Sequence, residues 1–156
     1  MLFRSPVLVK WTFDLETGTT QEETLDDAMA EFPRLDMRRL GQRSRFSYHQ
    51  RVAAAPTLLF DGVIKYDLER NSSVVHSYEK GWFGGETSFC PRLGGTEEDD
   101  GYLCTFVAHE ATGASELHVL DARNLNGAPL ARIQIPQRVP TGYHSWWVSA
   151  AEMLKA

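Results

Sequence analysis

A strand-like alternation of side chains is the feature that most restricts how this chain folds. Apolar side chains occupy every second position over residues 7–13, and the same period recurs over residues 132–135. A period of two, built from β-branched and aromatic residues, is typical of half-buried β-strands. Residues 102–107 are apolar on both faces, which indicates a central strand. We therefore expect an all-β chain, with short helices only at residues 22–30 and 150–155.

Turn signals separate the predicted strands and recur at wide spacing. Gly18, Asn71 and Gly113 each close an acidic, hairpin-like segment, and the three segments resemble one another. Gly and Asn accept the positive φ that tight hairpins need. A spacing of about 40–50 residues fits the blades of a β-propeller, whereas the alternative fold, a sandwich, requires no turn that recurs at this distance. The predicted fold class is therefore an all-β, partial β-propeller of about three to four blades.

Composition and charge narrow the class of protein. The chain has 156 residues, of which 42% are hydrophobic and 24% charged, with a net charge of −5. This is ordinary for a globular domain, and the acidic balance argues against a nucleic-acid partner, because phosphate binding needs clustered Lys and Arg. The most apolar run, residues 52–60, is too short to cross a bilayer as a helix, and residues 1–10 lack the pattern of a signal peptide. Cys90 and Cys104 lack the spacing of a metal or redox pair, so we expect buried thiols in a cytoplasmic protein.

Three residues between the predicted strands are candidates for chemistry. Glu31 lies before Phe-Pro-Arg-Leu, Glu86 follows two glycines, and His144 precedes a Ser-Trp-Trp segment. Taken singly, these signals are weak, because a lone His beside aromatic residues is usually a hydrogen-bonded structural residue and a Glu after glycines is usually solvated. The pair Gly84 and Gly85 nevertheless allows a close backbone approach that would carry Glu86 into a tight interior.

The stretches that contain these residues resemble the carotenoid cleavage oxygenase family, which includes lignostilbene dioxygenases, apocarotenoid oxygenases and the retinal pigment epithelium isomerase. The resemblance extends from about residue 8 to residue 148, and its matching stretches are residues 31–36, 60–67, 83–86, 97–103 and 142–148. It implies a seven-bladed β-propeller with Fe(II) on its axis. It also implies four histidines that hold the iron, and three glutamates that accept hydrogen bonds from three of their rings. Such a carboxylate orients a ligating imidazole and raises its basicity.

The resemblance implies a role for each of the three candidates. His144 matches the last of the four histidines, while Glu86 and Glu31 match two of the three glutamates. We expect Glu86 to orient His144, and Glu31 to orient a histidine that this chain lacks. No catalytic residue beyond the metal centre is implied. The other histidines do not match the family ligands and are interpreted as surface or structural residues: His49, His76, His109 and His118.

The length leads us to expect part of a larger protein. Seven blades of about 42 residues need on the order of 300 residues. We therefore interpret residues 1–156 as the C-terminal part of such a propeller, with residues 149–156 as a short tail. The expected function is that of a fragment of an Fe(II)-dependent dioxygenase that uses O₂ to cleave C=C bonds of carotenoids, apocarotenoids or stilbenes, and that is inactive alone. The alternatives are a non-catalytic half-propeller, acting as a scaffold or binding module that pairs with another chain or with itself through its open strand edges, and a remnant that folds poorly.

Three further features are interpreted as structural. The acidic run at residues 97–100 lacks the alternating spacing of a calcium loop and is expected to be a solvated approach to a hairpin. Trp146 and Trp147 are expected to make propeller core and closure contacts rather than a substrate platform. Ser145 is not expected to bond His144, because neighbours on a strand point to opposite faces.

Overall fold

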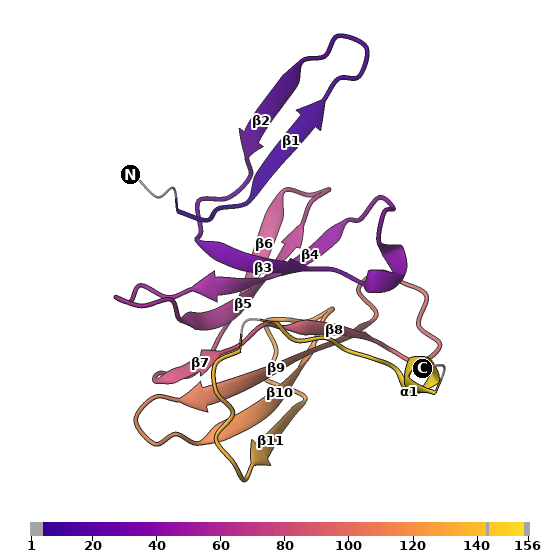
Figure 1. The fold of residues 1–156 in the computed structure, drawn as a ribbon. Coiled ribbons are helices and arrows are strands. Elements are labelled where there is room, and N and C mark those ends of the chain that lie inside the picture. The colour runs from indigo at the N-terminus through magenta and orange to yellow at the C-terminus, as the bar shows by residue number, and fades with distance from the viewer. Residues whose placement is uncertain (1–4, 143, 155–156) are drawn as a thin grey trace.

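The computed structural model describes residues 5–142 and 144–154, and its fold is all-β, as predicted. Its strands are β1 (Val9–Phe13), β2 (Thr20–Thr24), β3 (Ala30–Arg34), β4 (Phe46–Val52), β5 (Phe60–Asp67), β6 (Ser72–Ser77), β7 (Trp82–Gly84), β8 (Ser88–Pro91), β9 (Gly101–His109), β10 (Ser115–Asp121) and β11 (Ala131–Ile135). Two antiparallel four-stranded meanders make up most of the chain, the first with strands β3 to β6 and the second with β8 to β11 (Figure 1). The short strand β7 pairs with both β5 and β9 and joins the meanders into one nine-stranded sheet.

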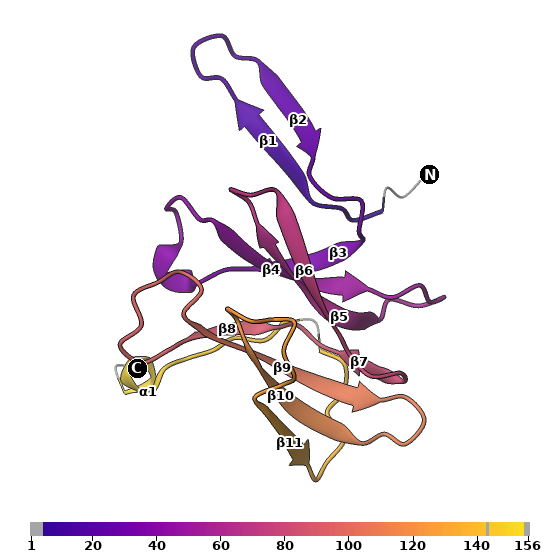
Figure 2. The same cartoon turned by 180° about the vertical axis from the view of Figure 1, so that it is seen from behind.

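The hairpin of β1 and β2 stands apart from this sheet. It forms a separate two-stranded sheet and projects away from the two meanders in both Figure 1 and Figure 2. Every residue of the hairpin strands except Val9 is exposed, including Trp11 and Phe13. A two-stranded hairpin with so little burial draws little stability from packing.

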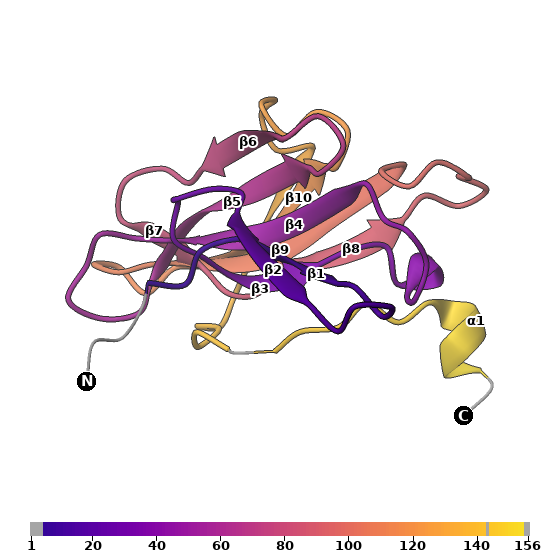
Figure 3. The ribbon, with the colours of Figure 1, turned by 90° about the horizontal axis from the view of Figure 1, so that it is seen from above.

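The main core lies between the two meanders, which are stacked face to face (Figures 1 and 3). Val63 on β5 faces this core, together with Leu103 and Val107 on β9. Its neighbour Ile64 points to the opposite face of β5 and packs with Ala30 in a second cluster. Both Val63 and Ile64 are fully buried, because successive side chains on a strand alternate between faces and both faces of β5 are covered. This face-to-face packing of four-stranded meanders is the arrangement of neighbouring propeller blades.

The three predicted turn residues all close hairpins. Gly18 (φ 70°), Asn71 (φ 47°) and Gly113 (φ 71°) lie in the turns between β1 and β2, β5 and β6, and β9 and β10. The positive φ explains why Gly or Asn occurs at each position. The turn at Asn71 joins the third and fourth strands of its meander, whereas the turn at Gly113 joins the second and third. The internal resemblance therefore marks similar hairpins and not equivalent positions in successive blades.

One of the two predicted helices is wrong. Residues 22–24 of the region expected to be helical belong to β2, which pairs with β1 along its full length, and Ala30, the last residue of that region, begins β3. Pairing with a neighbouring strand outweighs the local preference there. The second prediction is confirmed, since Ala150–Met153 forms α1 with a capping box between Ser149 and Glu152.

Parts of the sequence predictions lie outside the described residues. They are residues 1–4 of the segment inspected for a signal peptide, Tyr143 of the motif at 142–148, and residues 155–156 of the predicted tail. No helix in the portion that the structure describes is long and apolar enough to cross a membrane. Cys90 and Cys104 are free thiols on the adjacent strands β8 and β9.

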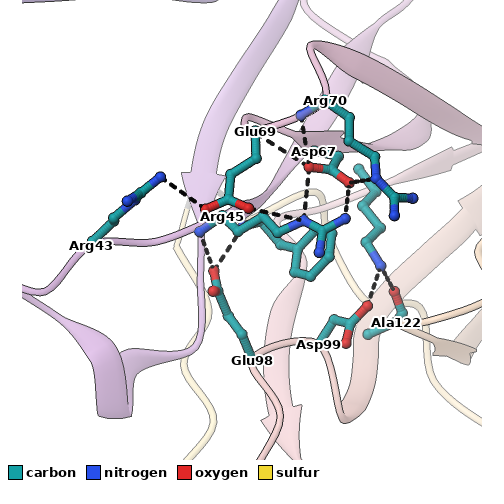
Figure 4. Close-up of polar contacts among 10 residues, drawn as sticks. Arg43, Arg45, Asp67, Glu69, Arg70, Glu98, Asp99 and Ala122 are labelled. Carbon is teal, nitrogen blue, oxygen red and sulfur yellow. Dashed lines mark hydrogen bonds and ion pairs between the residues drawn. The ribbon is translucent and has the colours of Figure 1, made fainter.

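The acidic run at residues 97–100 is only partly solvated: Glu97 is exposed, as predicted, whereas Glu98, Asp99 and Asp100 are half-buried, contrary to the prediction. Glu98, before β9, accepts hydrogen bonds through Oε1 from the backbone N–H groups of Arg45 (2.8 Å) and Phe46 (2.7 Å) at the start of β4 (Figure 4). A carboxylate that accepts two backbone N–H bonds from the other meander holds the two units together.

Asp99 makes a second bond between the meanders. Its Oδ2 is 2.8 Å from Nζ of Lys65 on β5, and the same Nζ donates to the carbonyl oxygen of Ala122 at 2.8 Å (Figure 4). The Lys65 ammonium also lies 4.2 Å from the centroid of the Phe46 ring. The sequence alone does not show that Lys65, on the other meander, faces Asp99, and the acidic run was therefore expected to be solvated.

A candidate metal-ligand position at Glu86 and His144

Glu86 is carried into the interior by the turn between β7 and β8. A Cβ built on Gly84 would lie 2.7 Å from atoms of the Tyr78 ring, so only glycine fits where the backbone passes that side chain. Two residues later, the side chain of Glu86 is only 3% exposed. The close backbone approach that the glycine pair predicted is therefore present at Gly84, and it places a carboxylate inside the fold.

His144 lies on the irregular segment that follows β11 and passes beside β8 (Figures 1 and 2). Its Nδ1 is 3.5 Å from Oε2 of Glu86, and its ring meets the Phe32 ring edge-on with 5.6 Å between centroids. The His144 side chain is 77% exposed, so one ring nitrogen faces a buried carboxylate while much of the ring is open to solvent. This is the arrangement in which a carboxylate fixes the orientation of an imidazole whose other nitrogen binds a partner.

Two further groups hold the Glu86 carboxylate. Oε2 accepts a hydrogen bond from the backbone N–H of Ser145 at 2.6 Å, and Oε1 is 2.6 Å from Nη2 of Arg34. The Ser145 hydroxyl in turn donates to the carbonyl oxygen of Glu86 (3.1 Å) and is 3.0 Å from Oγ of Ser88. Through Glu86 and Ser88, Ser145 thus holds the segment of His144 against the start of β8.

Sequence reasoning did not identify Arg34 as a site residue. In a regular strand, residues three positions apart face opposite sides, so Glu31 and Arg34 would not share a face. The register of β3 against β4 shifts between Glu31 and Arg34, and Phe32 has a φ of 53°. This irregularity redirects the side chains that follow it. The proline after Phe32 was the only sign of an irregular strand in the sequence.

Within the described part of the chain, Glu31 makes no hydrogen bond or ion pair with His144, although its neighbour Phe32 contacts the His144 ring. It is half-buried at the start of β3, where it pairs in register with Gln50 on β4. Among the residues that the structure describes, no hydrogen bond or ion pair joins Glu31 to a histidine. The prediction that Glu31 orients a histidine beyond this chain stays a prediction.

The remaining histidines occupy strands and a hairpin end. His49 on β4 is buried, hydrogen-bonded to the Ser47 hydroxyl and packed edge-on against a tyrosine ring, and burial lowers its pKa to about 4. His118 on β10 is also buried, with Nε2 2.9 Å from Glu116 Oε2. His76 lies on β6, and His109 ends β9, where its Nδ1 accepts the N–H of Thr112 at 3.3 Å.

The donor set fits one ligand of a metal rather than a complete site. Within residues 5–142 and 144–154, no group of three or more His, Cys, Asp or Glu side chains is arranged to hold a metal ion. His144 with the Glu86 carboxylate behind it has the chemistry of a single imidazole ligand, which suits Fe(II) when other imidazoles join it.

Two hollows adjoin the segment of His144. One, of about 200 Å³, is lined by Glu86 and His144 together with Phe83 and Phe106. The other, of about 380 Å³, is lined by Arg34 and by both tryptophans, Trp146 and Trp147. The tryptophans are 57% and 48% exposed, so they are not buried among the described residues, and their closure contacts with further blades stay a prediction.

Comparisons with known proteins agree with this fold. The chain matches the family model described as retinal pigment epithelial membrane protein over residues 3–149. It is 32% identical to carotenoid 9,10(9′,10′)-cleavage dioxygenase 1 of Pisum sativum, over 94% of this chain and 29% of that protein. It is 34% identical to the carotenoid cleavage oxygenase of Mycobacterium tuberculosis, over 91% of this chain and 29% of that protein.

A solved structure gives the same result. The crystal structure of cobalt-substituted Synechocystis ACO, an apocarotenoid oxygenase, superposes with a TM-score of 0.83 and 28% identity, over 92% of this chain and 31% of that chain. The fold is thus a β-propeller fold of the kind found in oxygenases. The chain belongs to the carotenoid cleavage oxygenase family, and it spans about 29% of the length of the two relatives described above.

Proposed function

We propose that this chain supplies one iron ligand, His144, and the carboxylate that orients it, Glu86, to an Fe(II)-dependent dioxygenase. The observation that carries the proposal is the 3.5 Å approach of His144 Nδ1 to the buried Glu86 carboxylate in a chain of this family. Glu86 holds the ring through Nδ1, which leaves Nε2 for the metal. Glu31 would do the same for a histidine from the rest of the propeller.

The proposed reaction is the oxidative cleavage of a C=C bond in a carotenoid, apocarotenoid or stilbene. Iron bound by four such histidines would activate O₂ beside the double bond. The part of this chain is to orient one imidazole and to keep the carboxylate behind it away from water. The relatives described above support a polyene substrate, since they are carotenoid cleavage enzymes. We further propose that the chain alone neither binds iron in stoichiometric amount nor cleaves a polyene, because one histidine does not make a specific site.

A chimera tests this proposal. The matching part of Synechocystis ACO is replaced by this chain, and the iron content and the aldehyde products from an apocarotenoid are measured. We expect H144A to lose most of both, whereas the matched control H109A, at a hairpin end outside the site, keeps both. A chimera with H144A that retains full iron would overturn the ligand role.

A second candidate function follows from the β1–β2 hairpin. Its strands form a separate two-stranded sheet and expose Trp11 and Phe13, so its edge is open to pairing with another strand. We propose, as the alternative, a non-catalytic half-propeller that associates through this edge. Light scattering on the purified chain distinguishes the two, because a monodisperse monomer at high concentration would contradict edge pairing.

A further inference from the structure

Arg34 connects the three segments that meet at Glu86. Its Nη2 is 2.6 Å from Glu86 Oε1 and donates to the backbone carbonyl oxygen of Ser145 at 3.3 Å. The guanidinium also lies over the ring of Trp146, with 5.3 Å between its central carbon and the ring centroid. A single side chain on β3 thus reaches both the carboxylate that precedes β8 and the segment that carries His144.

Burial makes this contact important for the position of Glu86. The side chains of Glu86 and Arg34 are 3% and 18% exposed. A carboxylate removed from water needs a charged or hydrogen-bonding partner, and loss of that partner drives it to turn or to admit water. Arg34 therefore determines where the Glu86 carboxylate rests.

The two carboxylate oxygens of Glu86 have separate partners. Oε1 is taken by Arg34, while Oε2 accepts the Ser145 N–H at 2.6 Å and faces His144 Nδ1 at 3.5 Å. With Oε1 fixed, rotation of the carboxylate about its last bond is restricted, and Oε2 stays directed at the ring. A guanidinium suits this task because its planar, rigid donors meet a carboxylate and a carbonyl at once.

We propose that Arg34 is a positioning residue that acts on His144 through Glu86. It fixes the carboxylate so that Oε2 meets both the Ser145 N–H and the His144 ring. The irregularity of β3 at Phe32 is what directs Arg34 to this side of the strand. The role at a metal rests on the proposed function, whereas the contact between Arg34 and Glu86 does not.

Amide hydrogen exchange at Ser145 tests the proposal in the 156-residue chain, with no metal needed. In R34Q, we expect the Ser145 amide to exchange about tenfold faster than in the wild type, because its charged acceptor is no longer held in place. The core amide of Leu103, followed in the same sample, reports global stability. The matched control is R132Q, which removes an exposed arginine bonded to another glutamate, Glu116 at 2.8 Å, and should leave the exchange of Ser145 unchanged. Equal Ser145 exchange in R34Q and wild type would overturn the proposal.

Two further variants keep the test decisive. R34K retains the positive charge but lacks the planar guanidinium with its several N–H donors. Its Ser145 amide should therefore exchange at a rate between those of wild type and R34Q. R34K serves as the test variant if R34Q does not fold. In that case, exchange at the wild-type rate in R34K overturns the proposal. In E86Q, Ser145 exchange should already be fast, and adding R34Q should accelerate it no further, since both changes act through one contact. Additive effects would contradict action through Glu86.

The His144 ring supplies the readout that a purely structural role would not move. We expect its ring ¹⁵N chemical shifts to change in R34Q and in E86Q, and to stay at wild-type values in R132Q. Unchanged His144 shifts in R34Q would overturn the positioning role even if Ser145 exchange rises. If the chimera experiment showed that His144 is not an iron ligand, the exchange and chemical-shift measurements would still test the role of Arg34. The two proposals are therefore tested separately.

Discussion

At the scale of the residue, Lys65 shows how one buried cation joins the two meanders. Its side chain is 10% exposed, and its ammonium bonds Asp99 and the Ala122 carbonyl oxygen. We expect K65M to lower the free energy of unfolding by about 2–4 kcal/mol, because it leaves Asp99 without its main partner. The control R43Q removes an 85% exposed arginine from Glu69 and should cost less than about 0.5 kcal/mol. Urea denaturation measures both, and a K65M variant as stable as R43Q would contradict the argument.

His49 makes a prediction about pH at the same scale. Burial lowers its pKa to about 4 in the folded chain, whereas the unfolded value is about 6.5. The unfolded state therefore takes up a proton first, and stability falls as the pH drops from about 6.5 to about 4, by up to about 3 kcal/mol. Denaturation at several pH values should show that the free energy of unfolding depends less steeply on pH in H49Q than in wild type. A slope unchanged in H49Q would show that this histidine is not the source.

Single residues also mark the limit of prediction from sequence. Glu86 and His144 gave only weak signals in their local sequence and were paired through the family resemblance, and the structure brings them to 3.5 Å. Arg34 and Lys65 were missed because their partners come from other strands, and no local pattern shows which side chains face each other across an interface. For Arg34, the register of β3 also shifts between Glu31 and Arg34, so regular alternation does not predict where this side chain lies.

At the scale of the element, the irregular strand β3 holds Phe32 at a φ of 53°, which L-residues other than Gly adopt at a cost. The comparison of F32A with F32G isolates that cost, since both lose the ring contacts to Phe60 and His144. We expect F32G to be more stable than F32A by about 1 kcal/mol, the reverse of the usual order in a strand. Thermal or urea unfolding measures the difference, and a more stable F32A would mean that the backbone is not strained there.

Strands and turns were predicted correctly where the local side-chain pattern agreed with the strand pairing in the structure. Alternation located β1 and β11, and Gly18, Asn71 and Gly113 located three hairpin turns. Prediction failed at residues 22–30, which were expected to form a helix. There, hydrogen bonds to β1 hold residues 22–24 in a strand, and Ala28 and Ala30 pack in the cluster that contains Ile64.

At the scale of the whole molecule, the described residues contain two complete four-stranded meanders and one two-stranded hairpin. The main core and the bonds of Glu98 and Asp99 lie between the meanders, so these two units support each other. The hairpin has no comparable partner among the described residues. Because the hairpin has fewer stabilising contacts than the meanders, we expect it to unfold locally while the meanders stay folded.

Hydrogen exchange tests this uneven stability. Because β1 and β2 are almost fully exposed, we expect their amides to exchange at least about a hundredfold faster than those of β5 and β9, whose strands lie in the core. Repeating the measurement at higher protein concentration distinguishes an isolated hairpin from one that pairs with a second copy. Edge pairing would slow exchange in β1 and β2 and leave β5 unchanged, with a matching rise in mass by light scattering. Hairpin amides as protected as those of β5 in a monomer would contradict the expectation, since they would require packing that these exposed strands do not have.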